Sequence, residues 1–227
     1  MPVSDWTHAP ALVLVTDSSR LRGRALADVV RAAVEGGVTI VQLRDKTAPH
    51  DALLREGASV REAIGRRALF FVNGDVEAAV ALRADGVHLP EAGAPTTAVR
   101  AHVGSTMLVS RAVHSLDAAL RAERDGADIV QAGTLFETAS KPGARTLGID
   151  GLRAICDAVR APVVAIGGVT AANAGEALAA GAAGVAVIGA IFDAADPPAA
   201  ARALREAMDG ARARTAVPPR VRSHLTR

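Results

Sequence analysis

Short apolar runs recur along the chain and alternate with segments of helical periodicity. The runs are too short for helices and are rich in β-branched residues, which is typical of buried parallel strands. Eight of them can be counted: Ala11–Thr16, Val38–Leu43, Ala68–Val72, Gly86–Leu89, Met107–Val109, Asp128–Ala132, Val163–Ile166 and Val185–Ile188. The pattern therefore predicts eight strands.

Segments with helical spacing lie between most of these runs. The clearest are Ala25–Glu35, Val76–Arg83, Leu116–Asp125, Ile149–Val159 and Ala171–Ala180. Strands that alternate with helices favour a parallel sheet with right-handed crossovers. In this length, eight such units predict a single (β/α)8 TIM barrel of the α/β class. The alternative is an open, doubly wound sheet, which would need a glycine-rich turn where Thr16-Asp17-Ser18-Ser19 stands.

The charge is unevenly distributed along the 227 residues. The net charge is +2, but residues 211–227 hold five arginines and no acid, so the rest of the chain carries −3. We therefore divide the chain into an N-terminal extension (1–10), a barrel domain (11–210) and a basic, disordered tail (211–227). The barrel domain shows no basic cluster and few aromatic residues, which argues against nucleic-acid binding.

Other sequence features indicate a cytoplasmic protein that does not enter a membrane. No apolar stretch approaches the length of a membrane span, and the N-terminus lacks a basic region followed by an apolar one. The one cysteine, Cys156, excludes an intramolecular disulfide. Its position in a predicted helix favours a packed side chain over a nucleophile.

Polar residues follow the second predicted strand at alternate positions. Gln42, Arg44 and Lys46 would point to one side, into the mouth of a barrel, where the active sites of barrel enzymes lie. Two cations and an amide there would suit a phosphate or another anion. The alternative is an ordinary charge cluster, paired with Asp45 or Asp75.

Two histidines and one long loop offer further chemistry at the strand ends. His88 and His114 are candidate acid–base groups, although a strand-end histidine is more often a hydrogen-bonded core residue. The loop from Gly133 to Gly148 could close over a ligand or stay solvated. Its candidate contacts are Thr134, Glu137, Thr138, Ser140, Lys141 and Arg145.

The stretch from Pro162 to Ala190 contains a predicted phosphate site. Gly167 and Gly168 follow the seventh strand, and Gly189 follows the eighth, directly after Ile188. Glycines at two neighbouring strand ends leave backbone N–H groups accessible to a phosphate. In a (β/α)8 barrel, this place after strands seven and eight is a frequent phosphate site.

Residues 11–208 resemble the thiamine phosphate synthase and TenI superfamily. The matching segments include LVTD (14–17), VQLRDK (41–46), FVNGDVEAAVALRADGVHLP (71–90), AVHS (112–115), GADIVQAGTLFETASK (126–141) and VVAIGGVTAANAGEALAAGAAGVAVIGAIF (163–192). The synthase branch joins a pyrimidine diphosphate to a thiazole phosphate with Mg²⁺ and releases pyrophosphate. The TenI-like branch includes thiazole tautomerases, which need no metal.

The resemblance implies a role for each candidate residue. Those that would hold the diphosphate are Gln42, Arg44, Lys46, Asn73 and Lys141. Thr138 and Ser140 would face the thiazole, with Thr134 beside them. Those that would bind the thiazole phosphate are Gly167, Gly168, Ile188 and Gly189. A homodimer is a further implication of the resemblance.

Several positions depart from the synthase pattern. The aspartates that bind Mg²⁺ in synthases are Gly74 and Gly93 here, and a serine is replaced by Ala112. We therefore expect no metal site, or one that Asp75 and Glu91 have taken over if Mg²⁺ binds at all. The tautomerase's proposed acid–base histidine is also replaced, by Thr134, which leaves His114 as the candidate, with Lys141 and Glu137 as partners.

These observations lead to one preferred function and two alternatives. We expect a TenI-like enzyme of thiamine biosynthesis that binds a thiazole phosphate, with tautomerisation as its reaction. The first alternative is a thiamine phosphate synthase, because Gln42, Lys46 and Asn73 would have no diphosphate to hold in a tautomerase. The second is a regulatory protein that binds a thiazole or thiamine phosphate without catalysis.

Overall fold

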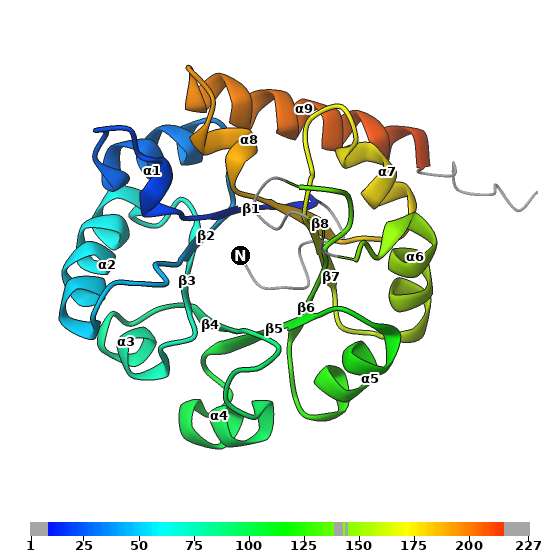
Figure 1. Ribbon diagram of the computed structural model, residues 1–227, viewed down its shortest axis with the longest axis horizontal. Helices are drawn as coiled ribbons and strands as arrows, with labels where there is room; N and C mark the ends of the chain where they lie inside the picture. The colour runs from blue at the N-terminus through cyan, green and yellow to red at the C-terminus, as the bar shows by residue number, and fades with distance from the viewer. Residues whose placement is uncertain (1–8, 139–142, 144, 216–227) are drawn as a thin grey trace, which may run out of the picture.

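The computed structural model describes residues 9–138, 143 and 145–215, and these form a closed barrel of eight parallel strands (Figure 1). Neighbouring strands pair in chain order, and β1 closes the barrel against β8. The strands are β1 (Ala11–Val15), β2 (Ile40–Leu43), β3 (Leu69–Asn73), β4 (Gly86–Leu89), β5 (Leu108–Val113), β6 (Ile129–Ala132), β7 (Val163–Ile166) and β8 (Gly184–Val187). The predicted (β/α)8 barrel is confirmed.

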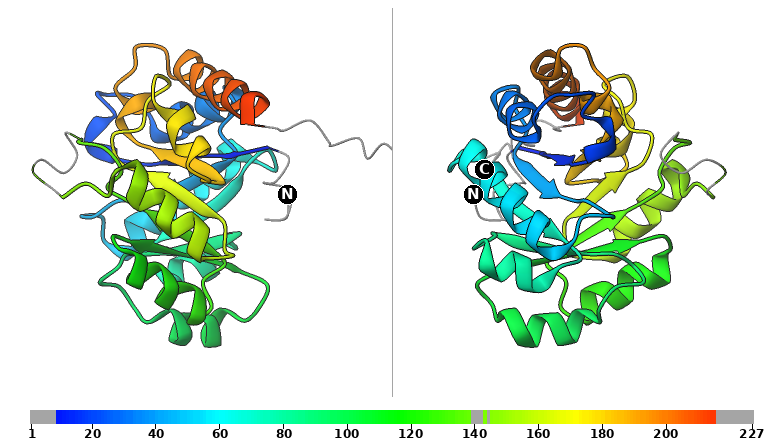
Figure 2. Two further views of the ribbon diagram at one scale, coloured as in Figure 1. Left: turned by 90° about the vertical axis from the view of Figure 1, so that its right-hand side faces the viewer. Right: turned by 60° about the vertical axis from the view of Figure 1, so that its left-hand side comes forward.

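A ring of helices surrounds the strands (Figure 1). The α-helices are α1 (Leu26–Glu35), α2 (His50–Ile64), α3 (Val76–Ala81), α4 (Thr96–Val103), α5 (Leu116–Arg124), α6 (Gly148–Ala158), α7 (Ala174–Ala179), α8 (Gly189–Phe192) and α9 (Pro197–Thr215). A 3₁₀ turn, η2 (Ser18–Arg20), follows β1. The last helix, α9, packs across α1 and α7 and continues the outer ring (Figure 2).

Alternate residues of each strand enter two separate cores. Outward-facing residues such as Leu12, Val41 and Val87 pack beneath the helices. Inward-facing residues such as Val13, Ile40 and Phe71 fill the barrel interior. Because the side chains of a strand alternate, the inward positions nearest the carboxyl ends of the strands form the floor of the barrel mouth.

Two sequence predictions about element boundaries were wrong. The strand β5 continues to Val113, so Ser110 and Ala112 lie inside the strand and not in the loop after it. The helix α9 continues to Thr215, so residues 211–215 are helical and do not belong to a disordered tail. Residues 216–227 and residues 1–8 of the predicted extension lie outside the described residues.

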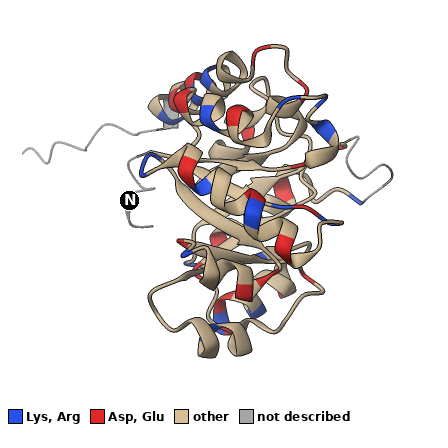
Figure 3. Ribbon diagram, turned by 90° about the vertical axis from the view of Figure 1, so that its left-hand side faces the viewer, with Lys and Arg blue, Asp and Glu red and all other residues tan. Residues whose placement is uncertain are grey.

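One face of the barrel carries charges of both signs, and Cys156 is a packed helix residue. Lys and Arg positions are interspersed with Asp and Glu positions on the face that carries α1, α2 and α3 (Figure 3). Cys156 lies on α6 against Gly181, and burial raises the pKa of its thiol to about 11, which leaves it a poor nucleophile. Within the described part of the chain, no helix is long and apolar enough to cross a membrane.

Candidate functional site

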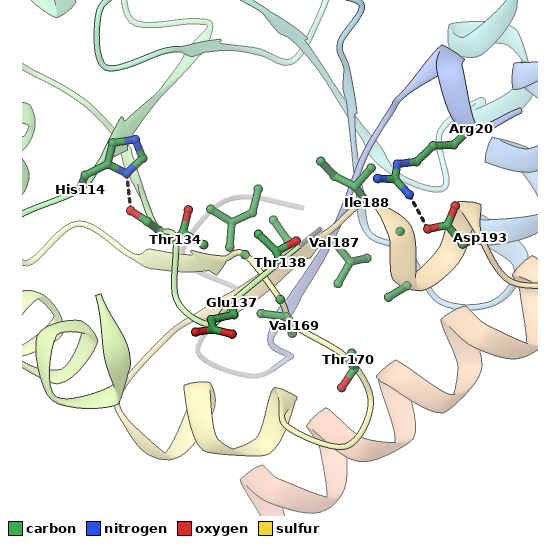
Figure 4. A pocket seen from close by; sticks show the side chains of 17 residues that line it. Arg20, His114, Thr134, Glu137, Thr138, Val169, Thr170, Val187, Ile188 and Asp193 are labelled. Atoms are coloured by element: carbon green, nitrogen blue, oxygen red, sulfur yellow. Dashed lines mark hydrogen bonds and ion pairs between the residues drawn. The ribbon is translucent and has the colours of Figure 1, made fainter. Parts of the chain in front are cut away.

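A pocket of about 340 Å³ opens beside the carboxyl ends of β6, β7 and β8 (Figure 4). The structure brings eight of the predicted site residues together in its lining: His114, Thr134, Glu137, Thr138, Gly167, Gly168, Ile188 and Gly189. Two further lining residues, Arg20 and Asp193, were not predicted to be functional. The predicted Ser140 and Lys141 lie outside the described residues.

The mouth has a polar floor between β2 and β6. Gln42 and His88 are each only 3 % exposed, although both carry polar side chains. The Nε2 atom of Gln42 donates to Oδ1 of Asn73 at 3.3 Å. Nδ1 of His88 lies 3.0 Å from the hydroxyl oxygen of Ser110. A neutral, hydrogen-bonding floor of this kind can hold a heteroaromatic ring or a polar tail by directed hydrogen bonds.

Burial keeps the imidazole of His88 uncharged. Desolvation, together with the positive charges of Arg111 and Arg44, lowers the pKa of His88 to about 3. An imidazole with this pKa is a poor proton donor at neutral pH. Of the two readings of His88 that the sequence left open, the structure therefore favours the hydrogen-bonded core residue.

The predicted cations Arg44 and Lys46 lie beyond the end of β2. The backbone N–H of Arg44 donates to the hydroxyl of the buried Thr16 at 2.7 Å, and this hydroxyl donates to the carbonyl of Arg44 at 3.0 Å. Arg44 is half-buried and Lys46 is exposed. This end of the β2–α2 loop is thus anchored to β1, two residues beyond Gln42.

The two acids offered as alternative partners for these cations are engaged elsewhere. Oδ1 of Asp45 accepts hydrogen bonds from the N–H groups of Thr47 and Ala48, at 2.8 and 3.0 Å. Asp75 caps α3 by accepting from the N–H of Ala78 at 2.8 Å, and its other oxygen lies 2.7 Å from Nδ1 of His50. These contacts fix two loops and weaken the interpretation of Arg44 and Lys46 as a simple charge cluster.

His114 stands at the edge of the pocket (Figure 4). Its Nδ1 atom hydrogen-bonds the carbonyl oxygen of Gly133 on the neighbouring β6–α6 loop. Its Nε2 atom lies 3.9 Å from Oε2 of Glu91. A carbonyl acceptor on Nδ1 places the proton there in the neutral ring, so that Nε2 is left as the basic nitrogen.

The glycine pair after β7 is required by close packing. Gly167 and Gly168 have φ angles of +106° and +66°, a region that favours glycine. A Cβ on Gly167 would lie 2.6 Å from Cγ2 of Thr134, and a Cβ on Gly168 would lie 2.4 Å from the carbonyl oxygen of Glu137. The pair therefore lets the β7–α7 and β6–α6 loops meet at the pocket wall.

Gly189 begins the one-turn helix α8, with Ile188 at its N-cap. The first N–H groups of a helix have no acceptor within it and can face a ligand. A Cβ on Gly189 would lie 2.7 Å from Oδ2 of Asp193 and 3.4 Å from Nη1 of Arg20. An ion pair from two distant parts of the chain thus lies against the predicted phosphate site.

The residues that we predicted for a relocated magnesium site do not fit one. Both carboxylate oxygens of Asp75 have hydrogen-bonding partners, and Glu91 is directed to His114. Among the described residues, no three His, Cys, Asp or Glu side chains gather in a way that could hold a metal ion. Mg²⁺ prefers carboxylate oxygens, and positions 74 and 93, in the loops after β3 and β4, hold glycine.

Comparison with known proteins gives a consistent result across nearly the whole chain. A family profile described as thiamine monophosphate synthase matches residues 12–191. The chain is 42% identical to the thiamine-phosphate synthase of Chloroflexus aurantiacus over 89% of this chain and 93% of that protein. It is 43% identical to that of Natronomonas pharaonis, over 87% of this chain and 94% of that protein.

A solved structure matches the fold and much of the sequence. The thiamine phosphate pyrophosphorylase of Pyrococcus furiosus superposes with a TM-score of 0.81 and is 38% identical, covering 88% of this chain and 96% of that one. The similarity therefore extends to both halves of the barrel mouth and is not confined to one motif.

Proposed function

Because the chain belongs to the thiamine monophosphate synthase family, we propose that it is a thiamine phosphate synthase. It would join hydroxymethylpyrimidine diphosphate to hydroxyethylthiazole phosphate and release pyrophosphate. The relatives are named as synthases, so they support a transferase and give no support to the tautomerase that we preferred from the sequence.

One structural observation carries this proposal beyond the family match. The barrel mouth contains a polar floor with the Gln42–Asn73 hydrogen bond, followed on the same strand end by Arg44, and a pocket around Gly168 and Gly189 whose lining does not include these residues. Two anionic substrates need two such regions. A tautomerase acts on one substrate and would leave the amide pair and the cations without a ligand.

The coupling reaction requires one bond to form and one to break. The lone pair of the thiazole nitrogen attacks the methylene carbon of the pyrimidine, and the bond from this carbon to the diphosphate oxygen breaks. The electron pair leaves with pyrophosphate, and the thiazole becomes a thiazolium cation. No proton is transferred in this step, so it does not require an acid or a base from His88, which is neutral in the floor of the mouth.

The described residues would act mainly by positioning and by electrostatic stabilisation. The amides of Gln42 and Asn73 would hold the diphosphate while Arg44 and Lys46 balance the charge that develops on it. The glycine-lined pocket would hold the thiazole phosphate, with Thr138 beside the ring. We propose Ser140 and Lys141 as further contacts on the same loop, and a homodimer as the assembly.

A direct assay tests this proposal. Purified protein is incubated with both substrates and Mg²⁺, and pyrophosphate and thiamine phosphate are quantified, with each substrate omitted in turn as a control. The synthase hypothesis predicts that both products form in equal amounts. If neither product forms while the thiazole carboxylate phosphate tautomer is aromatised in a parallel incubation, the protein is a tautomerase and the synthase hypothesis is wrong. If ligands bind and neither reaction occurs, the protein is a binding protein.

A further inference from the structure

Arg20 reaches the phosphate pocket from the opposite end of the sequence. It ends the turn η2 after β1, yet its Nη1 atom donates to Oδ2 of Asp193, just after α8, at 2.5 Å. Its Nε atom donates to Oδ2 of Asp17 at 3.1 Å, which fixes the direction of the side chain. Figure 4 shows the guanidinium and the carboxylate of Asp193 facing each other beside Ile188.

The charge balance in the pocket singles out this arginine. Among the described residues that line the pocket, Arg20 is the single Lys or Arg, whereas Glu137 and Asp193 are acids. A phosphate dianion in this pocket would be repelled by both carboxylates unless a cation faced it. The planar guanidinium can donate two hydrogen bonds to a phosphate and so compensate for the repulsion.

The loop that carries Arg20 is fixed to α8 independently of the ion pair. Nε of Arg24 donates to the carbonyl of Leu21 at 3.0 Å, and Nη2 of Arg24 donates to the carbonyl of Phe192 at the end of α8. Arg24 therefore holds the loop and the helix together. The Arg20–Asp193 pair, whose side chains are 24 % and 38 % exposed, lines the cavity and is not needed for that attachment.

We propose that Arg20 recognises the phosphate group of the thiazole substrate and that Asp193 is the competing counter-ion, which holds Arg20 ready when no phosphate is bound. The substrate in this inference rests on the proposed function. When the phosphate enters beside Gly189, Arg20 exchanges the carboxylate of Asp193 for phosphate oxygens. The pair thereby makes the pocket selective for the phosphorylated thiazole over the free alcohol.

The two partners should respond to substitution in opposite directions. Arg20→Gln removes the cation and is expected to weaken binding of hydroxyethylthiazole phosphate roughly 10- to 100-fold, the range for a charged hydrogen bond. Asp193→Asn removes a competing negative charge and is expected to tighten binding several-fold. Neither substitution should change the affinity for the unphosphorylated alcohol.

Calorimetric titration of the full-length protein tests these expectations with both thiazoles and with inorganic phosphate as a minimal probe. Arg22→Gln is the matched control: it removes the same charge from the same loop, and Arg22 lies 3.8 Å from Asp193 but does not line the pocket. It should leave all affinities within about twofold. Thermal unfolding of each variant verifies folding, and Arg20→Lys, which keeps the charge, should retain part of the phosphate selectivity.

Two results would overturn the proposal. If Arg20→Gln and Asp193→Asn weaken binding of hydroxyethylthiazole phosphate to the same degree, the ion pair only stabilises the structure and the proposal is wrong. Equal losses for the phosphate and the alcohol would also overturn it. These titrations involve no turnover, so they can succeed in a protein without synthase activity, and they can fail in an active synthase.

Discussion

The imidazole of His88 and the hydroxyl of Ser110 lie 3.0 Å apart on neighbouring strands, both buried at the floor of the barrel mouth. This hydrogen bond is between inward-facing residues that are paired in the register of β4 and β5. It compensates for part of the cost of burying an imidazole, while desolvation favours the neutral form, because a protonated ring would carry its charge in a desolvated site.

The depressed pKa of His88 predicts acid destabilisation. In the unfolded chain the imidazole titrates near 6.5, whereas in the folded protein its pKa is about 3. Between these values the unfolded state binds the extra proton. The contribution of His88 to the free energy of unfolding is therefore fully present above about pH 6.5 and is lost progressively as the pH drops towards 3. The slope from this one group is up to about 1.4 kcal/mol per pH unit.

Denaturant unfolding at several pH values, on wild type and on His88→Gln, measures this contribution. The variant should lose stability less steeply between pH 6.5 and pH 4, even if it is less stable at pH 7 because of poorer packing. His102→Gln, on the exposed surface of α4, serves as the control for removing an imidazole outside the barrel mouth. Identical slopes in all three proteins would show that His88 is accessible to protons in the native state.

The Gln42–Asn73 amide pair predicts a defect confined to one substrate. Gln42→Ala removes a donor from the polar floor and leaves Asn73 without its 3.3 Å partner. We expect the KM for the pyrimidine diphosphate to rise about tenfold, with an unchanged KM for the thiazole phosphate. Steady-state kinetics with each substrate varied in turn is the measurement. A rise of the same size in both KM values would refute the division of the mouth into two regions.

Two glycines of the predicted phosphate site should differ sharply in their tolerance of a methyl group. Gly168→Ala places a Cβ 2.4 Å from a backbone carbonyl at a φ of +66°, so the loop must move. We expect its Tm to fall by roughly 5 °C or more. Gly189→Ala meets the flexible ends of Asp193 and Arg20 and should fold with a nearly unchanged Tm.

The same pair of variants separates stability from binding. Gly189→Ala should still weaken the affinity for hydroxyethylthiazole phosphate, because its methyl group displaces the Arg20–Asp193 pair. Calorimetric unfolding and titration on one preparation give both quantities. A Gly189→Ala protein with wild-type phosphate affinity would place the phosphate elsewhere in the pocket.

Gly74 offers a test of the metal requirement. Its φ is +78°, which aspartate and asparagine adopt more readily than other side chains, and the nearest atom to an added Cβ is 3.9 Å away, on Pro90. Gly74→Asp adds a carboxylate beside Asn73 and should lower the Mg²⁺ concentration for half-maximal synthase rate several-fold. Gly74→Asn has the same shape without the charge and should not. Equal behaviour of the two variants would place the diphosphate away from this strand end.

The strands were predictable because each is a short apolar run with few alternatives. Seven of them begin and end within two residues of the prediction, and β5 was cut short because Ser110 and Arg111 interrupt its apolar pattern. The helices α2, α4 and α9 were missed, since all three are rich in charged or polar residues and begin at or directly after proline. Weak amphipathic patterns of this kind depend on tertiary packing for their stability.

The candidate site was predictable only where its residues follow strands. Gly189 and His114 could be identified from their place at strand ends, but Arg20 and Asp193 are 173 residues apart and meet only through the closure of β1 against β8. One local signal was available and overlooked: Asp75 directly precedes a helical segment, which is typical of an N-cap residue. That role accounts for its position.

The proposed function is tested most directly by single-turnover coupling of the two substrates, at saturating and at low pyrimidine diphosphate. We predict that pyrophosphate and thiamine phosphate appear at the same rate and in a one-to-one ratio, that omission of either substrate abolishes both, and that Gln42→Ala slows both equally at low pyrimidine diphosphate. Pyrophosphate released without the thiazole phosphate, or no product beyond the buffer control, would contradict a synthase with two substrate regions in one barrel mouth.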